Sequence, residues 1–567
     1  MKYYILFSGL AAIMLLSACD SSIERSSLTS PTAETFFTNE TEIQGGVNAC
    51  YNFLNECKGG YFDANYSLDG LADTEYLRGD NTIATINGGA MDYTTSTCST
   101  IWGRMYQGIG RCNLIIQKID ENQNNLSESV KKQFLGEVYF LRAYYYLKLI
   151  SYFGDVQYTD KPIETVSEGK SITRTAKAEV LKHIYSDFDL AADYLNGSTV
   201  TTLGRATRGA ALAFKARAAL YNGDYQTAKT AAKQVMDSGT YSLYPTYEDL
   251  FSEAVMRSSS NKELIFAADY DLAAGITSGY LRFVASRMMG GYCTIVPTEA
   301  MIDSYECIDG KDISESSLFN KATRFENRDP RLYYSVVLPG DKWFGVIFNT
   351  HKDSTKCYNY ETNTWVTNKD CYAFTQYCSF SGYLIRKYVN SAYLSSIDQS
   401  ENPYYLCRYA EVLLTYAEAK IELNEIDQSC LDAINLVRCG RTDVKMPVIP
   451  SGLSQTQMRK VIRKERKVEL AFENLRFQDI LRWKSAEKVM NRPKLGRAFL
   501  GSLSQWPDVT FDENGDPVYD YNNYVPHPST DFRVILNCYF NPDRDYLWPI
   551  PQREILMNPD LGQNLNY

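Results

Sequence analysis

Cys19 is the residue whose neighbours most directly specify a chemical reaction. Leu, Ser and Ala precede it, and an apolar run over residues 4–16 begins shortly after the positive charge of Lys2. Such a run is too short for a permanent membrane span, which takes about 20 residues, but it suits a secretory signal. The pattern predicts removal of residues 1–18 and acylation of the Cys19 thiol. An ordinary signal peptide with an incidental cysteine is the alternative interpretation.

Acylation at this position would tether the rest of the chain to a membrane. Each buried lipid methylene contributes about 0.8 kcal/mol, so several acyl chains hold a soluble domain stably at the surface. Residues 19–38 are polar and rich in turn-forming residues, which is typical of a tether. No second long apolar segment follows Cys19. The sequence therefore predicts an anchored protein and not a membrane-spanning one.

Little in the sequence points to catalysis. The three histidines, His183, His351 and His527, lie far apart and lack metal-ligand spacing. A glycoside hydrolase needs two carboxylates beside the scissile bond, but pairs are inevitable among 68 acidic residues and carry no weight. No nucleophile elbow, phosphate loop or dinucleotide fingerprint occurs. We expect a binding protein that is not an enzyme, with a glycoside hydrolase as the rival.

Asp512–Asp516 is the stretch that resembles part of a calcium loop. Its oxygen-bearing side chains suit calcium, but the remaining ligands and the distal Glu of that pattern are missing. A tight turn is the favoured interpretation. We expect no cofactor, with calcium at this turn as the alternative.

The charge balance excludes one class of partner. The chain carries 58 basic and 68 acidic residues, a formal net charge of −10. No cluster of basic and aromatic residues suggests nucleic acid. The run of Arg and Lys over residues 459–467 is interpreted as a solvated helix face. Contact with an acidic partner surface is the alternative.

Helical periodicity dominates two separate parts of the chain. Ala-rich helices flanking the turn Asn222-Gly223-Asp224 are typical of tetratricopeptide-like hairpins. The pattern predicts a mainly α fold in which about four imperfect helical hairpins form a scaffold, rather than a regular solenoid. The predicted helices cover residues 40–55, 101–119, 131–153, 175–195, 207–221 and 225–238, and then 408–423, 429–439, 458–472 and 477–490.

A large insertion separates the two helical sets. Residues 241–402 contain short β-like runs at 263–270, 333–338 and 383–388, together with glycine-rich joints. Loops on a rigid scaffold are where binding residues concentrate. We therefore divide the chain into an N-terminal helical region (39–240), a loop-rich ligand-binding insertion (241–402), and C-terminal helical hairpins with an irregular tail (403–567).

Long motifs in a fixed order link the chain to a known family. The clearest is GEVYFLRAYYYLKLISYFGDVQY at residues 136–158, an Arg-Ala followed by aromatics and ending at Phe-Gly-Asp. Others are IWGRMYQGIGRCNLIIQKI (101–119), RYAEVLLTYAEAKIELN (408–424), ERKVELAFENLRFQDILRW (465–483) and YLWPIPQREILMNPDLGQN (546–564). Together these segments resemble the SusD/RagB family of Bacteroidetes outer-membrane lipoproteins over essentially the whole mature chain.

This resemblance implies a SusD-like fold and a carbohydrate-binding role. In the family, the lipoprotein sits at the outer membrane as a hinged lid over a SusC-like TonB-dependent transporter and delivers an oligosaccharide to it. The tetratricopeptide face contacts the transporter, and the loop-rich face holds the sugar. Surface-exposed members usually carry an acidic cluster after the lipid cysteine, but here only Asp20 and Glu24 follow it. Some relatives bind peptides, so a peptide-import lipoprotein is the alternative.

A sugar site needs a flat aromatic for the ring face and polar side chains for the rim. In the insertion, Trp343 and Trp365, with the nearby Tyr358 and Tyr360, are the first candidates for stacking. The alternative is that each tryptophan packs onto the helical core beneath it.

Two further groups extend the list of candidate ligand-binding residues. Asp73, Tyr76 and Arg78 lie in the long early loop, where Arg78 between carboxylates could bind a sugar rim or form a solvated ion pair. Tyr280 and Tyr292 lie beside glycines in the insertion, with the same two alternatives of binding and packing.

Overall fold

The computed structural model describes residues 37–55, 58–59, 62–63, 67–79, 81–121, 125–198, 202–372, 378–497, 508–520 and 532–567. The predicted signal peptide, Cys19 and nearly all of the predicted tether lie outside these residues, so lipidation stays a prediction. The helices are α2 (Glu40–Cys50), α3 (Asn81–Asn87), α4 (Ser96–Asp120), α5 (Glu128–Phe153), α6 (Val166–Ser171), α7 (Lys177–Tyr194), α8 (Arg208–Tyr221), α9 (Tyr225–Asp237), α10 (Glu253–Met256), α11 (Tyr280–Val284), α12 (Glu299–Ser304), α13 (Pro330–Ser335), α14 (Tyr409–Glu422), α15 (Gln428–Cys439), α16 (Gln455–Glu469), α17 (Arg476–Arg482), α18 (Ala486–Val489) and α19 (Gln552–Met557).

Side-chain caps determine where the long helices begin. Ser127, Thr207 and Asp224 each accept a hydrogen bond from a backbone amide in the first turn of α5, α8 and α9. At the start of α16, Ser454 and Gln457 form a reciprocal capping box. These side chains satisfy N–H groups that no carbonyl within the helix can reach. The long helices accordingly lie where the periodicity predicts them, within a few residues at each end.

A buried polar triad joins the first three long helices. Arg142 of α5 donates two hydrogen bonds to the Asp187 carboxylate of α7, both at 2.7 Å, and one to Asn113 of α4 at 3.0 Å. All three side chains are buried. The two-point guanidinium–carboxylate contact fixes orientation as well as distance. It explains why the motifs at 101–119 and 136–158 keep a polar residue among apolar ones.

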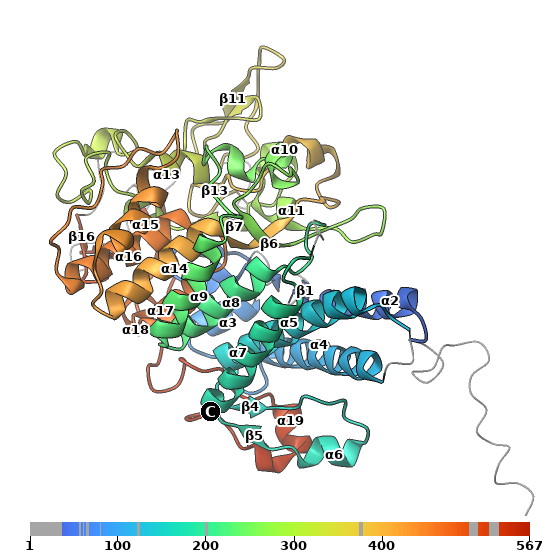
Figure 1. Cartoon of the computed structure of the whole chain (residues 1–567). Helices are drawn as coiled ribbons and strands as arrows, with labels where there is room; N and C mark the ends of the chain where they lie inside the picture. Colours follow the sequence, from blue (N-terminus) through green and yellow to red (C-terminus); the bar gives the residue numbers. More distant parts are fainter. Residues whose placement is uncertain are drawn as a thin grey trace, which may run out of the picture.

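The two helical sets form one continuous layer. α9, the last helix of the first set, packs directly against α14, the first helix of the second (Figure 1). Arg217 of α8 reinforces this junction by donating to both carboxylate oxygens of Glu411 on α14, at 2.6 and 2.5 Å. The packing order is α4, α5, α7, α8, α9, α14, α15 and α16. The expected mainly α scaffold with a looped-out insertion is confirmed.

Within the insertion, the described strands are short, and only those of one sheet pair with their neighbours in the sequence. β9 to β12 form one antiparallel sheet, and its hairpin β11–β12 projects at the end of the molecule opposite α6 and α19 (Figure 1). The strands in all described parts of the chain, inside and outside the insertion, are β1 (Lys58–Gly59), β2 (Phe62–Asp63), β3 (Glu75–Leu77), β4 (Val156–Gln157), β5 (Arg174–Thr175), β6 (Leu264–Ala268), β7 (Ile295–Pro297), β8 (Val336–Val337), β9 (Lys342–Trp343), β10 (Val346–Ile347), β11 (Lys356–Asn359), β12 (Thr364–Thr367), β13 (Leu384–Ile385), β14 (Tyr404–Arg408), β15 (Lys494–Arg497), β16 (Val509–Phe511), β17 (Pro517–Tyr519) and β18 (Phe532–Leu536).

The first half of one predicted β-like run, residues 333–338, is helical. Residues 333–338 were expected to form a strand, but α13 occupies the run up to Ser335 and only Val336–Val337 is extended. Asp329 caps this helix and Pro330 fills its first turn, where a missing N–H costs nothing. The start signal thus makes the first half of the run helical, and the β-branched Val336 and Val337 remain extended.

A two-stranded neck closes the insertion where it leaves the helices. β6 near its start pairs antiparallel with β14 near its end, with Leu264 opposite Arg408. Arg408 donates to Glu263 and to Glu469 at the end of α16, both at 2.7 Å. Arg441 reaches the same two carboxylates at 2.8 and 2.9 Å. These residues are fully buried, so the neck is fixed to α16 by an ion network that excludes water.

The basic run over residues 459–467 is not a solvated face, which corrects the expectation. Lys464, Arg466 and Lys467 are buried and paired. Each has an acidic partner on another segment, because a buried charge requires a counter-charge. Lys464 contacts Glu306 at 2.7 Å, Arg466 contacts Asp479 at 2.9 Å, and Lys467 contacts Asp516.

Among the described residues, no helix combines the length and the apolar character that a membrane span requires.

Candidate functional site

The hairpin β11–β12 carries three clustered aromatic side chains. Trp365 on β12 lies opposite Tyr358 on β11, with ring centroids 5.7 Å apart, and Tyr360 packs on Tyr358 at 4.9 Å. Trp365 is 67% exposed and Tyr360 is 43% exposed. The Lys342 ammonium lies 4.5 Å from the Tyr360 ring centroid and helps to hold that ring. An exposed group of large aromatics is typical of an interaction surface.

Trp343, the other tryptophan predicted to stack on sugar, is not exposed. It is 8% exposed, although it belongs to the same sheet as Trp365. Its ring lies 4.4 Å from the Phe344 ring centroid and 5.2 Å from the Arg386 guanidinium. Trp343 therefore attaches the sheet to the body of the protein, and its assignment to the binding surface is corrected.

The hairpin is anchored at its base by two buried polar residues. Asn368 donates to the carbonyls of Asn349 and Ser354, both at 2.8 Å. The Asp370 carboxylate accepts the backbone N–H of Arg287 at 2.7 Å. Burial raises the pKa of Asp370 to about 6, and the hydrogen bond from Arg287 opposes this rise. The base of the hairpin therefore contacts the turn that precedes Tyr292, through Asp370 and Arg287.

Tyr292 is the centre of a second, cationic group. Its ring is 38% exposed, and the guanidinium groups of Arg282 and Arg287 lie 5.9 and 5.8 Å from the ring centroid. Arg78 donates to the Tyr292 backbone carbonyl at 2.7 Å. Because Arg78 directly follows β3, the pairing of β3 with β7 brings the early loop to the insertion, and the Arg78 N–H reaches the Thr294 carbonyl at 2.8 Å.

Phe380 extends this group. The guanidinium groups of Arg78 and Arg533 lie 4.9 and 5.1 Å from its ring centroid. Tyr76 stacks on the same ring, with centroids 6.0 Å apart and planes at 14°. Tyr76 itself is buried, so it supports Phe380 from beneath and is not available for stacking on a ligand. Tyr76 is thus a second correction to the predicted surface.

Two further candidates have structural roles. Tyr280 is 3% exposed, packs on Tyr388 at 5.9 Å, and donates to the Lys387 carbonyl at 3.1 Å. Asp73 is buried and binds the Arg476 guanidinium through both oxygens, at 2.8 and 3.0 Å. Neither side chain is available at the surface, and both assignments are corrected. Trp365, Tyr358, Tyr360, Tyr292 and Arg78 remain candidates.

Sequence reasoning missed Phe380, Arg282, Arg287 and Arg533. Their neighbours in the chain carry no motif, and the group forms only when β3, the turn after α11 and β18 come together. The sequence signal is weak: Arg282 and Arg287 precede Gly290-Gly291 and the candidate Tyr292 within ten residues.

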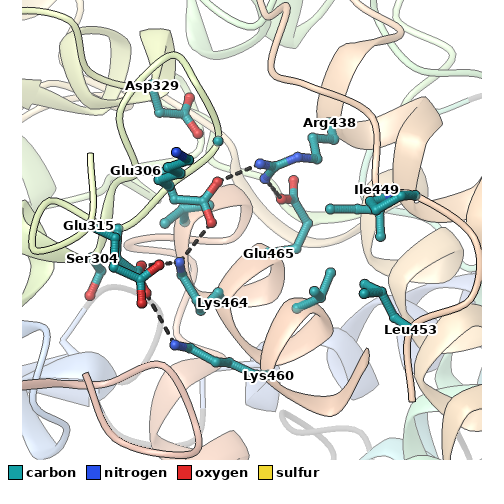
Figure 2. Close-up of a pocket in the computed structure, with 16 residues that line it drawn as sticks. Ser304, Glu306, Glu315, Asp329, Arg438, Ile449, Leu453, Lys460, Lys464 and Glu465 are labelled. Atoms are coloured by element: carbon teal, nitrogen blue, oxygen red, sulfur yellow. Dashed lines mark hydrogen bonds and ion pairs between the residues drawn. The ribbon is translucent and has the colours of Figure 1, made fainter. Parts of the chain in front are cut away.

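A pocket of about 250 Å³ lies between the insertion and helices α15 and α16. Figure 2 shows Glu306 between Arg438 of α15 and Lys464 of α16. Arg438 also contacts Glu465 at 3.0 Å, and Lys460 contacts Asp312 at 3.1 Å. These charges are mutually compensated, so we assign the pocket wall to structure. It joins the insertion to the scaffold.

A larger hollow of about 730 Å³ lies on the helical side, between the α8–α9 turn, α17 and the C-terminal segment. Tyr221, Tyr225 and Tyr546 contribute aromatic surface to it. Two of these rings already have cationic neighbours: Lys484 lies 3.7 Å from the Tyr546 centroid, and Arg482 lies 5.5 Å from that of Tyr221. This hollow is separate from the hairpin and shares no residue with it.

The stretch Asp512–Asp516 forms a tight turn between β16 and β17. The Gly515 N–H bonds the Asp512 carbonyl at 3.0 Å, and the Asp512 carboxylate accepts the amides of Asn514 and Asp516 at 2.9 and 3.0 Å. The Asp516 carboxylate pairs with Arg476 at 2.7 Å. Within the described part of the chain, no group of three or more His, Cys, Asp or Glu is arranged to hold a metal ion.

The surface formed by Trp365, Tyr360 and Tyr292 is suited to binding sugars. An aromatic ring accepts the polarised C–H face of a pyranose, and guanidinium groups donate to its hydroxyl oxygens. The Asp370 carboxylate links the base of the hairpin to the Arg287 backbone, five residues before Tyr292. An extended ligand that met several such rings would compensate for weak single contacts.

Family models match most of the chain. A model described as "SusD family" matches residues 250–567, and one described as "Starch-binding associating with outer membrane" matches residues 52–220. The chain belongs to the SusD family. The description of the second model associates its members with starch binding and the outer membrane.

Individual relatives agree with this assignment over nearly the full length. The SusD-like protein P2 of Formosa agariphila is 26% identical to this SusD family member, covering 99% of each chain. The crystal structure of a SusD-like carbohydrate-binding protein from Bacteroides fragilis has 26% identity and a TM-score of 0.78, covering 93% of this chain and 100% of its own. A laminarin-binding SusD-like protein shares the fold at a TM-score of 0.63 and 19% identity, covering 94% of this chain and 100% of its own.

Proposed function

We propose that this SusD family member is a surface lipoprotein without catalytic activity that captures an oligosaccharide for import. The observation that carries the proposal is the exposed indole of Trp365, held against Tyr358 on a hairpin that projects from the protein. A solvent-exposed indole of this kind provides a flat apolar platform for a sugar ring. A family model described as "Starch-binding associating with outer membrane" matches residues 52–220 and supports the proposal.

The two ends of the molecule have different roles in this proposal. The hairpin end presents aromatic and cationic side chains, whereas the helical layer presents the hollow at the α8–α9 turn. We assign ligand capture to the hairpin end and contact with a SusC-like TonB-dependent transporter to the helical layer. Acylated Cys19 would hold the protein at the outer membrane, facing outward, where it meets the ligand before the transporter does.

The first experiment is a glycan-array screen of the soluble chain beginning at Asp20, followed by calorimetry on each hit. The proposal expects binding confined to one polysaccharide class and unchanged oligosaccharides after prolonged incubation. Release of shorter products would instead assign a glycoside hydrolase. Binding of peptides, with no response to any glycan from folded protein, would assign peptide import.

The transporter and anchor parts of the proposal need separate tests. Replacing Cys19 by Ala in cells should release the protein from the membrane fraction, whereas replacing Cys439 on α15 should not. Co-purification of a TonB-dependent transporter with the wild-type lipoprotein is expected. Loss of that complex in variants of the hairpin alone would contradict the assignment of transporter contact to the helical layer.

A further inference from the structure

We propose that the hollow beside the α8–α9 turn binds an acidic segment of the transporter, and that Lys177 and Lys484 hold a carboxylate of that segment between them. The inference rests on the proposed contact between the helical layer and a TonB-dependent transporter, and it names the site and the chemistry of that contact. The hollow has a volume of about 730 Å³, which lies in the range of pockets that enclose a ligand.

The wall of this hollow carries an excess of positive charge. Among the described residues that line it, four are basic and one is acidic. Arg482 is neutralised by Glu418, whose carboxylate it contacts at 2.6 Å. The other basic residues are Arg174, Lys177 and Lys484, and within the described part of the chain none of these three has a carboxylate within salt-bridge distance.

The two nearest acids offset only part of this charge, because both already accept other hydrogen bonds. The Asp155 carboxylate accepts the backbone N–H of Lys177, the first residue of α7, at 2.8 Å. Glu487 acts on Lys484, but its carboxylate accepts the Tyr546 hydroxyl at 2.9 Å. The two ammonium groups therefore retain N–H donors for an incoming carboxylate.

The two lysines lie in surroundings that disfavour their charge. Desolvation lowers the pKa of Lys177, the charge of Lys484 lowers it further, and Asp155 opposes both effects. Desolvation also lowers the pKa of Lys484. A carboxylate beside them favours both charged forms, whereas a neutral ligand does not.

The backbone at Lys484 supports a role for its side chain. This residue follows Trp483, which ends α17, and adopts a φ of 54° in the left-handed region. Glycine is the usual residue at this position after a helix, because it adopts that conformation without a steric cost from Cβ. Residues held in such a conformation concentrate at ligand and partner contacts. The lysine is thus placed on the hollow at a cost to the end of the helix.

The tyrosines of the hollow favour a protein segment over a sugar. The Lys484 ammonium lies 3.7 Å from the Tyr546 ring centroid, and the Arg482 guanidinium lies 5.5 Å from that of Tyr221. A cation therefore occupies one face of each ring, which removes that face as a platform for a pyranose. Tyrosine and arginine are enriched at the cores of protein–protein interfaces.

The first test uses the mature lipoprotein purified together with its transporter from outer membranes. The double variant Lys177→Gln/Lys484→Gln should retain about tenfold less transporter than the wild type, because both charge-assisted contacts are lost. Its melting temperature should not fall, since neither lysine has a counter-charge to lose. Lys182→Gln is the matched control on α7. Lys182 pairs with Glu179 at 2.6 Å and does not line the hollow, so this variant should leave the complex unchanged.

Cross-linking identifies the chemistry of the contact. A carbodiimide joins an amine directly to a carboxylate, so mass spectrometry of the treated wild-type complex should find Lys177 or Lys484 linked to an Asp or Glu of the transporter. Raising the ionic strength should weaken the wild-type complex more than that of the double variant, because salt screens the charges that the variant lacks.

The outcomes separate this inference from the function on which it rests. A folded double variant that retains the transporter as well as the wild type does, or cross-links from these lysines only to this chain, would overturn the acidic contact and leave the transporter assignment intact. Absence of a TonB-dependent transporter from the wild-type preparation would overturn both. Glycan binding, measured by calorimetry, should be the same in the double variant and the wild type in every case.

Discussion

Trp365 and Tyr358 lie directly opposite each other on β12 and β11, with their rings 5.7 Å apart at 72°. The pair gives the hairpin an aromatic face, of which Trp365 is the exposed part. We predict that Trp365→Ala lowers oligosaccharide affinity about tenfold or more, because the indole platform is lost. Calorimetry with the ligand identified by the glycan array measures the change, and the melting temperature should stay close to that of the wild type.

Trp343 provides the matched control. Since its ring is buried beneath the sheet, Trp343→Ala should cost about 3–5 kcal/mol of unfolding free energy. Any loss of binding should therefore accompany loss of stability in urea titrations. Normal stability with abolished binding for this variant would place the stacking platform at Trp343 and contradict our assignment.

A second prediction concerns Glu469 at the neck of the insertion. Its carboxylate contacts Arg331, Arg408 and Arg441, all of which are fully buried. Glu469→Ala should cost about 3–5 kcal/mol, because it leaves buried positive charge without compensation. Chemical denaturation measures this loss. The exposed pair of Glu179 and Lys182 is the comparison, and Glu179→Ala should leave the stability close to that of the wild type.

Glu306 should make the protein sensitive to acid. Burial alone would raise its pKa, but the charges of Lys464 and Arg438 prevail and lower it from 4.5 to about 2. A depressed pKa stabilises the folded state above pH 4.5, and this stabilisation is lost as the pH falls toward 2. The contribution is on the order of 3 kcal/mol, of which roughly 2 kcal/mol is lost by pH 3.

Urea unfolding at pH 7 and pH 3 tests this prediction. Glu306→Gln should be less stable at pH 7, and its stability should fall less between the two pH values than that of the wild type. An identical pH dependence in the variant would mean that Glu306 does not titrate as described.

A further prediction concerns Gly108, on which the contact of α4 with α5 depends. A Cβ at this position would lie 2.7 Å from the Tyr145 ring, whereas one at Gly110 would meet nothing within 4 Å. Gly108→Ala should therefore destabilise the protein by about 1–3 kcal/mol through overpacking. Gly110→Ala should stabilise it by up to about 1 kcal/mol, since Ala is the better helix former. Thermal melts of both variants distinguish these effects by sign.

The helical scaffold could be predicted from the sequence because its signals are local. Caps such as Thr207 and Ser454 lie next to the apolar repeats that they start. The helix expected over residues 477–490 is the exception. It breaks at Lys484, which adopts a positive φ of 54° between α17 and α18. No glycine or proline marks this break, and the Ser485 side chain at the start of α18 makes no capping hydrogen bond.

The binding surface was only partly predictable, since exposure depends on distant partners. Trp343 and Trp365 both lie in aromatic, polar sequence, yet Arg386 and Phe344 cover Trp343, whereas Trp365 is 67% exposed. In the same way, the buried state of Lys464 depends on Glu306, more than 150 residues earlier in the chain. Spacing along one segment contains no information about such partners.

The paired strands β6 and β14 have a consequence for how this protein can change during evolution. They bring the two ends of the insertion together, and Arg408 fixes that junction to Glu469 of α16. The chain beyond the junction is a closed loop, and doubling the length of such a loop costs only about 0.6 kcal/mol in closure entropy. Within this loop, the projecting sheet β9 to β12 can therefore lengthen, shorten or exchange its hairpin while Glu306 and Arg331 keep their contacts with α15 and α16. One inherited scaffold can thus acquire new ligands through changes in a single region.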